Sequence, residues 1–273
     1  MTYLPRIAGL LMAAAATAAA PGAAAQGGDS MTRGIQQYRE AVADSNPGEL
    51  WEIRGEELWK ARRGPAQVSL ERCDLGRGPG VVAGAYASLP RYFADAGRVM
   101  DLESRLLYCM ITLQGFSRDE ALARPFGDGE RRSDFEALAA YVAAQSRGWK
   151  MDIPLSRPEE QAAYREGARI FVYRAGTHDF ACATCHGQSG KRIRLQDLPN
   201  LADPADARRA YTSWPAYRVS QGEMRTMQWR LNDCFRQQRF PELVYGSEVS
   251  VALTMYLARN ANGGVLAAPG VKR

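Results

Sequence analysis

The sequence predicts a mostly α-helical protein made of two similar domains, and three observations support this prediction. Apolar residues recur at helical spacing in both halves, whereas no alternating strand pattern persists in either half. The chain of 273 residues is long enough for two domains of ordinary size. Residues 125 positions apart also match between the halves, with the same spacing in each. The matching pairs are Pro90 and Pro215, Tyr92 and Tyr217, Arg105 and Arg230, Leu106 and Leu231, and Cys109 and Cys234.

A second offset, of 112 residues, aligns the earlier parts of the two halves. At this offset Gly55, Trp59 and Cys73 fall on Gly167, Phe171 and Cys185. Thirteen residues were therefore gained or lost between the two aligned blocks. Because spacing as well as residue type is repeated, internal duplication explains these matches better than chance does. The predicted domains cover residues 26–150 and 151–273.

The first 25 residues have the features of a secretory signal peptide. Arg6 precedes an apolar run over residues 7–20, and three alanines at 23–25 offer a small-residue cleavage site. The run is short for a permanent membrane anchor, and no later segment is apolar enough to span a bilayer. We therefore expect residues 1–25 to be removed on export, and the mature chain to be periplasmic without a membrane span.

Each domain is expected to begin with a helix that carries a closely packed glycine. Pro47 and Pro158 mark the two helix starts, since proline is favoured in the first helical turn. Gly55 and Gly167 each lie four residues before an aromatic residue, so that a second helix can approach the glycine while the ring fills the adjacent space. The expected partner helices span residues 133–145 and 247–259.

The remaining stretches connect these helices. A further helix is expected over residues 222–238, and residues 149–158, with two prolines and no periodicity, are expected to link the domains. Residues 76–84 and 197–214 are rich in turn-forming residues and are predicted to be loops.

A Cys-x-x-Cys-His motif, formed by Cys182, Cys185 and His186, is the attachment sequence of a c-type haem. The two thiols add to the haem vinyl groups, and the imidazole becomes an axial iron ligand. A redox dithiol does not need the following histidine, and no second Cys-x-x-Cys pair completes a zinc site. We therefore predict one covalently bound haem c in the second domain.

The first domain has no such motif. At the 112-residue offset, Leu70 and Asp74 stand where the motif has its first cysteine and its histidine, and only Cys73 matches. The first domain is therefore predicted to be a cytochrome c-like domain without haem. The repeat places Cys109 across from the missing haem position, so that Cys73 and Cys109 are expected to form a disulfide in an oxidising compartment.

Cys234 remains unpaired, in the region where small cytochromes carry their sixth iron ligand. Arg230 precedes it by one helical turn, and a cation there favours the thiolate and can hold an anion beside the sulfur. The alternative is that Cys234 is an inert core thiol and Arg230 a solvated surface charge. The rival ligands are Met224, Met227 and, less suitably placed, His178.

The stretch over residues 225–234 reads Arg-x-Met-Gln-x-Arg-Leu-x-x-Cys and lies downstream of the haem motif. Together with the first-domain stretches over 75–80, 89–93 and 103–110, it resembles the SoxA family, the cytochrome subunits of the thiosulfate-oxidising L-cysteine S-thiosulfotransferase of bacteria. Some members of that family attach haem in both domains, whereas this sequence has the attachment motif only in the second.

The resemblance implies that Cys234 is both an axial haem ligand, opposite His186, and the sulfur acceptor, carried as a persulfide. It implies that Arg230 contacts the substrate. It also implies a heterodimer with a small c-type cytochrome, SoxX, and transfer of the product to a cysteine of the carrier complex SoxYZ. The expected reaction is the oxidative coupling of thiosulfate to that cysteine, with two electrons passed to c-type cytochrome.

Functions of two other classes are also compatible with the sequence. The first is a periplasmic electron-transfer cytochrome c with a methionine axial ligand and no bond-forming activity, and the second is a structural module stabilised by its haem. The net charge of +5 suits an anionic substrate or an acidic protein partner. Because an exported haem protein is not expected to bind nucleic acid, we interpret the charge as electrostatic steering.

Overall fold

The computed structural model describes residues 46–122, 134–193 and 196–272, together with residues 33, 34, 37, 38 and 41. The chain divides into a unit over Met1–Glu40 and a unit over Ala41–Arg273, and the fold below is that of the second unit. The predicted signal peptide over residues 1–25 lies outside the described residues. Within the described ranges, no helix is long and apolar enough to cross a membrane.

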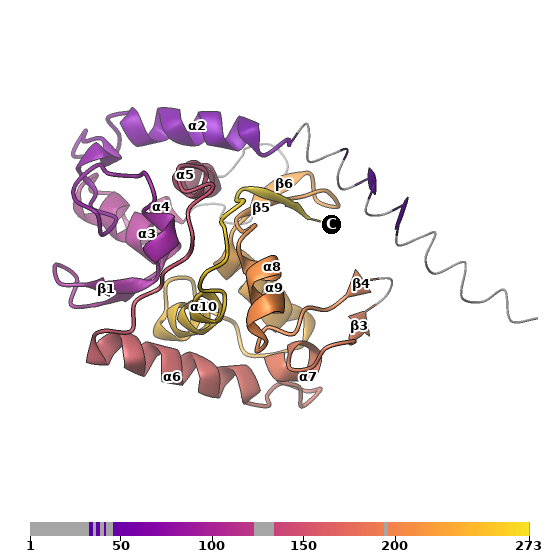
Figure 1. Ribbon diagram of the computed structural model, residues 1–273. Helices are drawn as coiled ribbons and strands as arrows, with labels where there is room; N and C mark the ends of the chain where they lie inside the picture. The colour runs from indigo at the N-terminus through magenta and orange to yellow at the C-terminus, as the bar shows by residue number, and fades with distance from the viewer. Residues whose placement is uncertain are drawn as a thin grey trace, which may run out of the picture. The chain divides into compact units, whose positions relative to one another are not determined.

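The first half of this unit runs from helix α2 (Glu49–Lys60) to helix α5 (Asp134–Ala144) (Figure 1). α2 begins just after Pro47, and the backbone N–H of Gly48 donates to the Asn46 side chain at 2.9 Å. Between these helices lie the turns η1 (Leu70–Arg72) and η2 (Tyr86–Ser88), the strands β1 (Arg91–Phe93) and β2 (Arg98–Met100), and the helices α3 (Leu102–Thr112) and α4 (Arg118–Ala121).

The second half repeats this order. It runs from helix α6 (Pro158–Val172), which has proline in its first turn, to helix α10 (Glu248–Asn260) and the final strand β7 (Gly270–Lys272). Between α6 and α10 lie helix α7 (Cys182–His186), strands β3 (Arg192–Ile193) and β4 (Gln196–Asp197), helix α8 (Pro204–Tyr211), strands β5 (Ala216–Arg218) and β6 (Glu223–Arg225), and helix α9 (Met227–Gln237).

The predicted 125-residue repeat is confirmed by matching elements. β1, β2 and α3 recur as β5, β6 and α9, and each element begins and ends 125 residues after its counterpart. β1 pairs antiparallel with β2, as β5 does with β6, and β7 adds a parallel third strand beside β5. A side chain caps the N-terminus of each helix, that of Asp101 for α3 and that of Thr226 for α9. The fold is therefore mostly α-helical, with two equivalent halves, as predicted.

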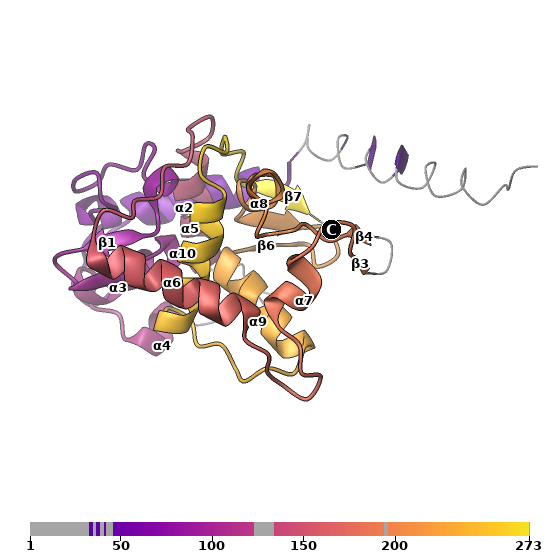
Figure 2. The same cartoon turned by 60° about the horizontal axis from the view of Figure 1, so that its bottom comes forward.

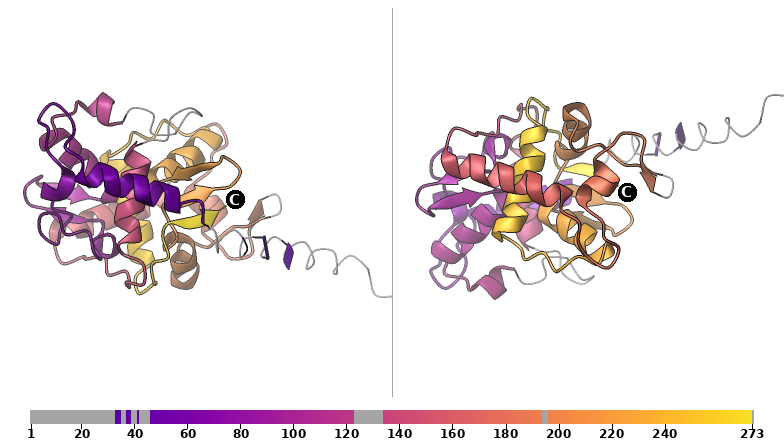
Figure 3. Two further views of the ribbon diagram at one scale, coloured as in Figure 1. Left: turned by 90° about the horizontal axis from the view of Figure 1, so that it is seen from above. Right: turned by 90° about the horizontal axis from the view of Figure 1, so that it is seen from below.

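The two glycines allow the helix crossings that were expected of them. A Cβ atom on Gly55 of α2 would lie 2.0 Å from the carbonyl oxygen of Ala137 in α5. A Cβ atom on Gly167 of α6 would lie at the same distance from the carbonyl oxygen of Ala252 in α10. Figure 3 shows both crossings, α2 over α5 on the left and α6 over α10 on the right. Backbones at this separation leave no room for a side chain, so only glycine fits at each crossing.

Three expectations about local structure were wrong. Neither half was expected to contain strands, yet each has a hairpin, whose strands of three residues are too short to give an alternating sequence pattern. The helix expected over 222–238 begins only at Met227, because residues 223–225 pair as β6. The loop expected over 197–214 contains α8, which Asp203 caps and Pro204 opens.

The stretch over residues 149–158 lies against both halves, and the Asp152 N–H donates to the carbonyl oxygen of Ala87 in the first half at 2.8 Å. Met151 donates its N–H to the carbonyl oxygen of Gly264 at 2.9 Å, and Ile153 donates to the Asn262 side chain at 2.9 Å. Both side chains are buried, at 2% and 0% exposure. The domain boundary at residues 150 and 151 stays a prediction.

Candidate functional site

The haem motif forms a short helix of its own. α7 follows the end of α6 (Figure 2) and begins after Ala181, whose backbone N–H donates to the Thr184 hydroxyl at 2.9 Å. All residues of α7 are partly exposed, and Cys182 and Cys185 are free thiols. Because these cysteines are three residues apart in a helix, they lie on one face of it.

His186 is held by the backbone through one ring nitrogen. Its Nδ1 lies 2.9 Å from the carbonyl oxygen of Pro199. A carbonyl oxygen can only accept, so Nδ1 carries the proton and Nε2 keeps its lone pair. Burial lowers the pKa of His186 and the charge of Arg230 lowers it further, although the hydrogen bond to Pro199 acts in the opposite direction. His186 is therefore a neutral imidazole at pH 7, the form that ligates a metal.

Cys234 is a third free thiol, half-buried on α9. Its pKa is raised mainly by burial, while Arg230 lowers it and both Asp233 and Cys185 raise it further. The pKa of Cys182 is raised to about 12, first by burial and then by the charge of Cys234. The structure therefore brings Cys234 within electrostatic reach of both motif cysteines, although 49 residues separate it from Cys185 in the sequence.

Arg230 lies one turn before Cys234 on α9, and a neighbouring carboxylate fixes its position. Its Nη1 is 2.9 Å from Asp233 Oδ2, and its side chain is 28% exposed. Asp233 is almost fully buried and also accepts hydrogen bonds from Arg236 at 2.7 Å and from Gln237 at 2.8 Å. The guanidinium group of Arg230 is thus held beside the thiol.

Arg218, at the end of β5, is a second cation at this site and was missed by the sequence analysis. Its Nε is buried and makes no hydrogen bond to any residue that the structure describes. Burial lowers the pKa of Arg218, and the nearby charge of Arg230 lowers it further. In turn, Arg218 lowers the pKa of Cys234. Two guanidinium groups near one thiol repel each other, so an anion between them would be stabilised.

A comparison of the two repeats could have revealed Arg218. Its counterpart 125 residues earlier is Phe93, and the counterpart of Arg230 is Arg105. In the first repeat the Arg105 guanidinium lies 4.1 Å from the centroid of the Phe93 ring, a cation–π contact. In the second repeat Arg218 stands in place of that aromatic ring, which adds a second positive charge. The change from Phe93 to Arg218 between the repeats is the sequence signal that points to this residue.

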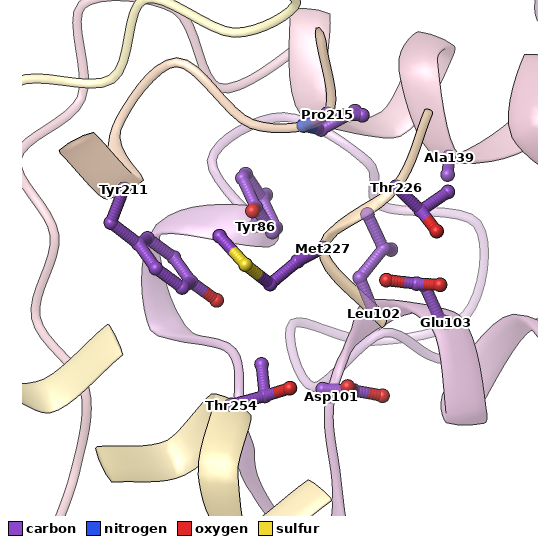
Figure 4. Close-up of a pocket in the computed structure, with 10 residues that line it drawn as sticks. All are labelled: Tyr86, Asp101, Leu102, Glu103, Ala139, Tyr211, Pro215, Thr226, Met227 and Thr254. Carbon is purple, nitrogen blue, oxygen red and sulfur yellow. The ribbon is translucent and has the colours of Figure 1, made fainter. Parts of the chain in front are cut away.

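The rival iron ligands lie elsewhere. Met224 is fully buried, and its terminal methyl group lies against Gly48, at the start of α2. Met227 lines a cavity of about 10 Å³ between the two halves (Figure 4). His178 is exposed, with its ring 5.8 Å from that of Phe180. Their positions favour Cys234 as the side chain that faces the haem motif.

Cys73 and Cys109 form a disulfide, with their Cα atoms 5.7 Å apart. At the two repeat offsets, these residues correspond to Cys185 and Cys234. The first repeat therefore joins covalently the two positions that carry free thiols in the second.

The residues around α7 fit a c-type haem. Two free thiols have the attachment spacing, and the imidazole of His186 has one nitrogen fixed by the backbone and the other free to ligate. A third sulfur, that of Cys234, shares their electrostatic environment. Sulfur and imidazole are both established haem iron ligands, so this donor set suits the cofactor.

Comparisons with known proteins agree with this site. Residues 54–151 and 166–266 match the family described as SoxA/TsdA, cytochrome c domain. The chain is 51% identical to the L-cysteine S-thiosulfotransferase subunit SoxA of Hydrogenophilus thermoluteolus, over 97% of both chains. It is 35% identical to the subunit of the same name from Hydrogenobacter thermophilus, over 83% of this chain and 82% of that one.

The fold also matches a solved structure. The crystal structure of SoxXA from P. pantotrophus aligns with a TM-score of 0.70 and 24% identity, over 87% of this chain and 84% of that chain. The two matched family segments confirm two cytochrome c-like halves, and a cytochrome c domain implies haem c. On this sequence identity over nearly its whole length, the chain belongs to the SoxA family of L-cysteine S-thiosulfotransferase subunits.

Proposed function

We propose that this chain binds one haem c and uses Cys234 and two arginines to couple thiosulfate to a cysteine of a carrier protein. Cys182 and Cys185 would attach the haem, while His186 and Cys234 would be its axial ligands. The single haem follows from the repeat, since the first half has Leu70 and a disulfide where the second has free motif cysteines.

The proposed reaction requires an electron acceptor. Joining the terminal sulfur of thiosulfate to a cysteine thiol forms one S–S bond, breaks one S–H bond, and releases one proton and two electrons. Haem c, when bound, supplies one-electron acceptor chemistry. Two electrons therefore need a second acceptor, and by analogy with the named SoxXA complex we assign that role to a small c-type cytochrome, SoxX.

Cys234 provides a soft sulfur site at which the incoming sulfur can be held as a persulfide or thiosulfonate. Burial disfavours its thiolate, whereas Arg230 and Arg218 both favour it. The same two guanidinium groups offset the charge of the dianionic substrate, and their planar forks suit its sulfonate oxygens. Asp233 positions Arg230 for this task.

Partner and compartment follow from the same proposal. The expected product acceptor is a cysteine of the carrier complex SoxYZ, and the expected compartment is the periplasm, reached through the signal peptide over residues 1–25. Export also suits covalent haem attachment and the Cys73–Cys109 disulfide.

The observation that carries the proposal is a free thiol, Cys234, within electrostatic reach of Arg230, Arg218 and both cysteines of the haem motif. The mature protein, produced with SoxX, should contain one haem per chain by the pyridine haemochrome assay. Thiosulfate should reduce an acceptor cytochrome only when SoxYZ is present, and the mass of the carrier should rise by one –S–SO₃⁻ group. Two haems per chain, or a carrier of unchanged mass after turnover, would contradict the proposal.

A further inference from the structure

The first turns of α3 and α9 meet between the two halves, where the carboxyl groups of Asp101 and Glu103 accept hydrogen bonds from Gln228. The N–H of Gln228 in α9 donates to Glu103 Oε1 at 2.8 Å, and the Gln228 side-chain amide donates to Asp101 Oδ2 at 2.7 Å. Thr226 and the backbone N–H of Met227 also lie close enough to the Glu103 carboxyl group to lower its pKa. A residue of the first half therefore accepts from one of the first free N–H groups of the helix that carries Arg230 and Cys234.

Glu103 is well enclosed at this junction. It is 6% exposed, and its Oε2 is buried without a hydrogen-bond partner among the described residues. Glu103 also lines the small cavity between the halves, beside Asp101, Thr226 and Met227 (Figure 4). A carboxyl group that is buried with one oxygen unsatisfied is costly, so its presence calls for an explanation beyond packing.

We propose that Glu103 is a positioning residue for Cys234 and Arg230, because its carboxyl group fixes the first turn of the helix that carries both. This inference rests on the proposed roles of these two residues. A shift at the start of an 11-residue helix moves the side chains one and two turns further along it. The haem-less half would thus serve the site by holding α9 in place.

The protonation state of Glu103 is part of this proposal. Burial and then the charge of Asp101 raise its pKa to about 8, although the hydrogen bond from the Gln228 N–H lowers it. Near neutral pH the group is therefore protonated, and it gains a buried negative charge as the pH passes about 8. The charged or titratable groups that face it from the surrounding elements are Asp101 before α3, Glu136 of α5 with its partner Arg225 of β6, Tyr86 of η2, Tyr211 of α8, and Tyr245 before α10.

Substitution of Glu103 in the haem-loaded chain tests the proposal, with Glu160 as the matched control. Glu160 is also buried, at 2% exposure, and accepts from the N–H groups of Arg157 and Tyr92 at 3.1 Å each. It therefore caps α6 and joins the two halves without touching α9. Both E103A and E160A should lower the melting temperature. Only E103A should speed amide hydrogen exchange in the first turn of α9, by about tenfold, and alter the ferric haem absorption spectrum.

The conservative variant separates positioning from general destabilisation. Glutamine keeps an acceptor at Oε1 and cannot ionise, so E103Q should retain the exchange rates and spectrum of the parent protein at pH 6. The parent protein should show a spectral transition with a midpoint near pH 8, and E103Q should not. These measurements need no thiosulfate, so they stand even if the proposed reaction fails. The proposal is overturned if E103A has the parental spectrum and α9 exchange, or if E160A changes both as much.

Discussion

Cys109 and Cys234 occupy the same position of two helices that stand 125 residues apart, yet Cys109 is locked in a disulfide with Cys73 and Cys234 is a free thiol. The same pair of positions is therefore a disulfide in one half and two free thiols in the other. In the first half the pair forms a covalent bond, which stabilises the fold. In the other half the corresponding sulfurs, those of Cys185 and Cys234, stay available for chemistry.

Removing the disulfide should destabilise the fold without changing the haem. The bond closes an interval of 36 residues, for which the chain-entropy model gives a stabilisation of about 4 kcal/mol. We expect the double variant C73S/C109S to lose a large part of that stability in denaturant titrations while keeping its ferric spectrum. A double variant as stable as the parent chain, under conditions where the parent is oxidised, would contradict this.

The parts of the fold that the sequence predicted correctly are those encoded by repeated spacing. Gly55 and Gly167 mark their helix crossings because only glycine allows carbonyl groups so close. The hairpins were missed because strands of three residues have no measurable period. The helix over 222–238 was drawn too long because its capping residue, Thr226, follows a strand that the helical pattern does not distinguish.

Only the site residues that belong to a short sequence motif could be predicted. The haem motif and the Arg230–Cys234 spacing are local signals, one turn of one helix or less. Arg218 became visible only when its position was compared with Phe93, and the contact of Glu103 with Gln228 joins residues 125 apart. Such contacts depend on how two halves pack together, and no periodicity along the chain encodes that.

The protonation of Glu103 should make stability fall as the pH rises. Its pKa is about 8 in the folded protein and 4.5 as an ordinary glutamate, so between these values the folded state binds more protons than the unfolded state. The free energy of unfolding then decreases with rising pH across this window. In E103Q this part of the pH dependence should disappear. Chemical denaturation at pH 5, 6.5 and 8.5 measures it, and equal slopes in parent and variant would refute the shift.

Arg230→Ala should weaken thiosulfate binding while leaving haem attachment intact. The thioether bonds do not involve Arg230, whereas a dianion loses a charge-assisted hydrogen bond of about 1.5–3 kcal/mol, so that kcat/KM should fall roughly 10- to 100-fold. Arg230→Lys should restore activity only in part, because a point charge cannot reproduce the planar fork. Steady-state kinetics with SoxX and SoxYZ measure both variants. Unchanged kinetics in the alanine variant would make Arg230 a solvated surface charge.

Arg218→Ala should raise the KM for thiosulfate by about tenfold, since one of two cations near Cys234 is lost. Arg218→Gln, which keeps most of the volume, should behave similarly if charge is the cause. The matched control is Arg174→Ala, because Arg174 is exposed and pairs with Asp179 at 2.9 Å on the surface. The control should keep the parental KM. A KM in Arg218→Ala equal to that of the control would remove Arg218 from the substrate site.

The enzyme proposal depends most on Cys234. If it is both axial ligand and sulfur acceptor, Cys234→Met should keep covalent haem, because Cys182 and Cys185 remain. Its ferric spectrum should change, since methionine ligates iron differently from a thiolate. Activity should be lost, because a thioether cannot form a persulfide.

In the unmodified protein, mass spectrometry without reductant should find part of the Cys234 peptide carrying an extra sulfur that cyanide removes. A variant with the parental spectrum and full thiosulfate oxidation would show that Cys234 is neither the axial ligand nor the sulfur acceptor.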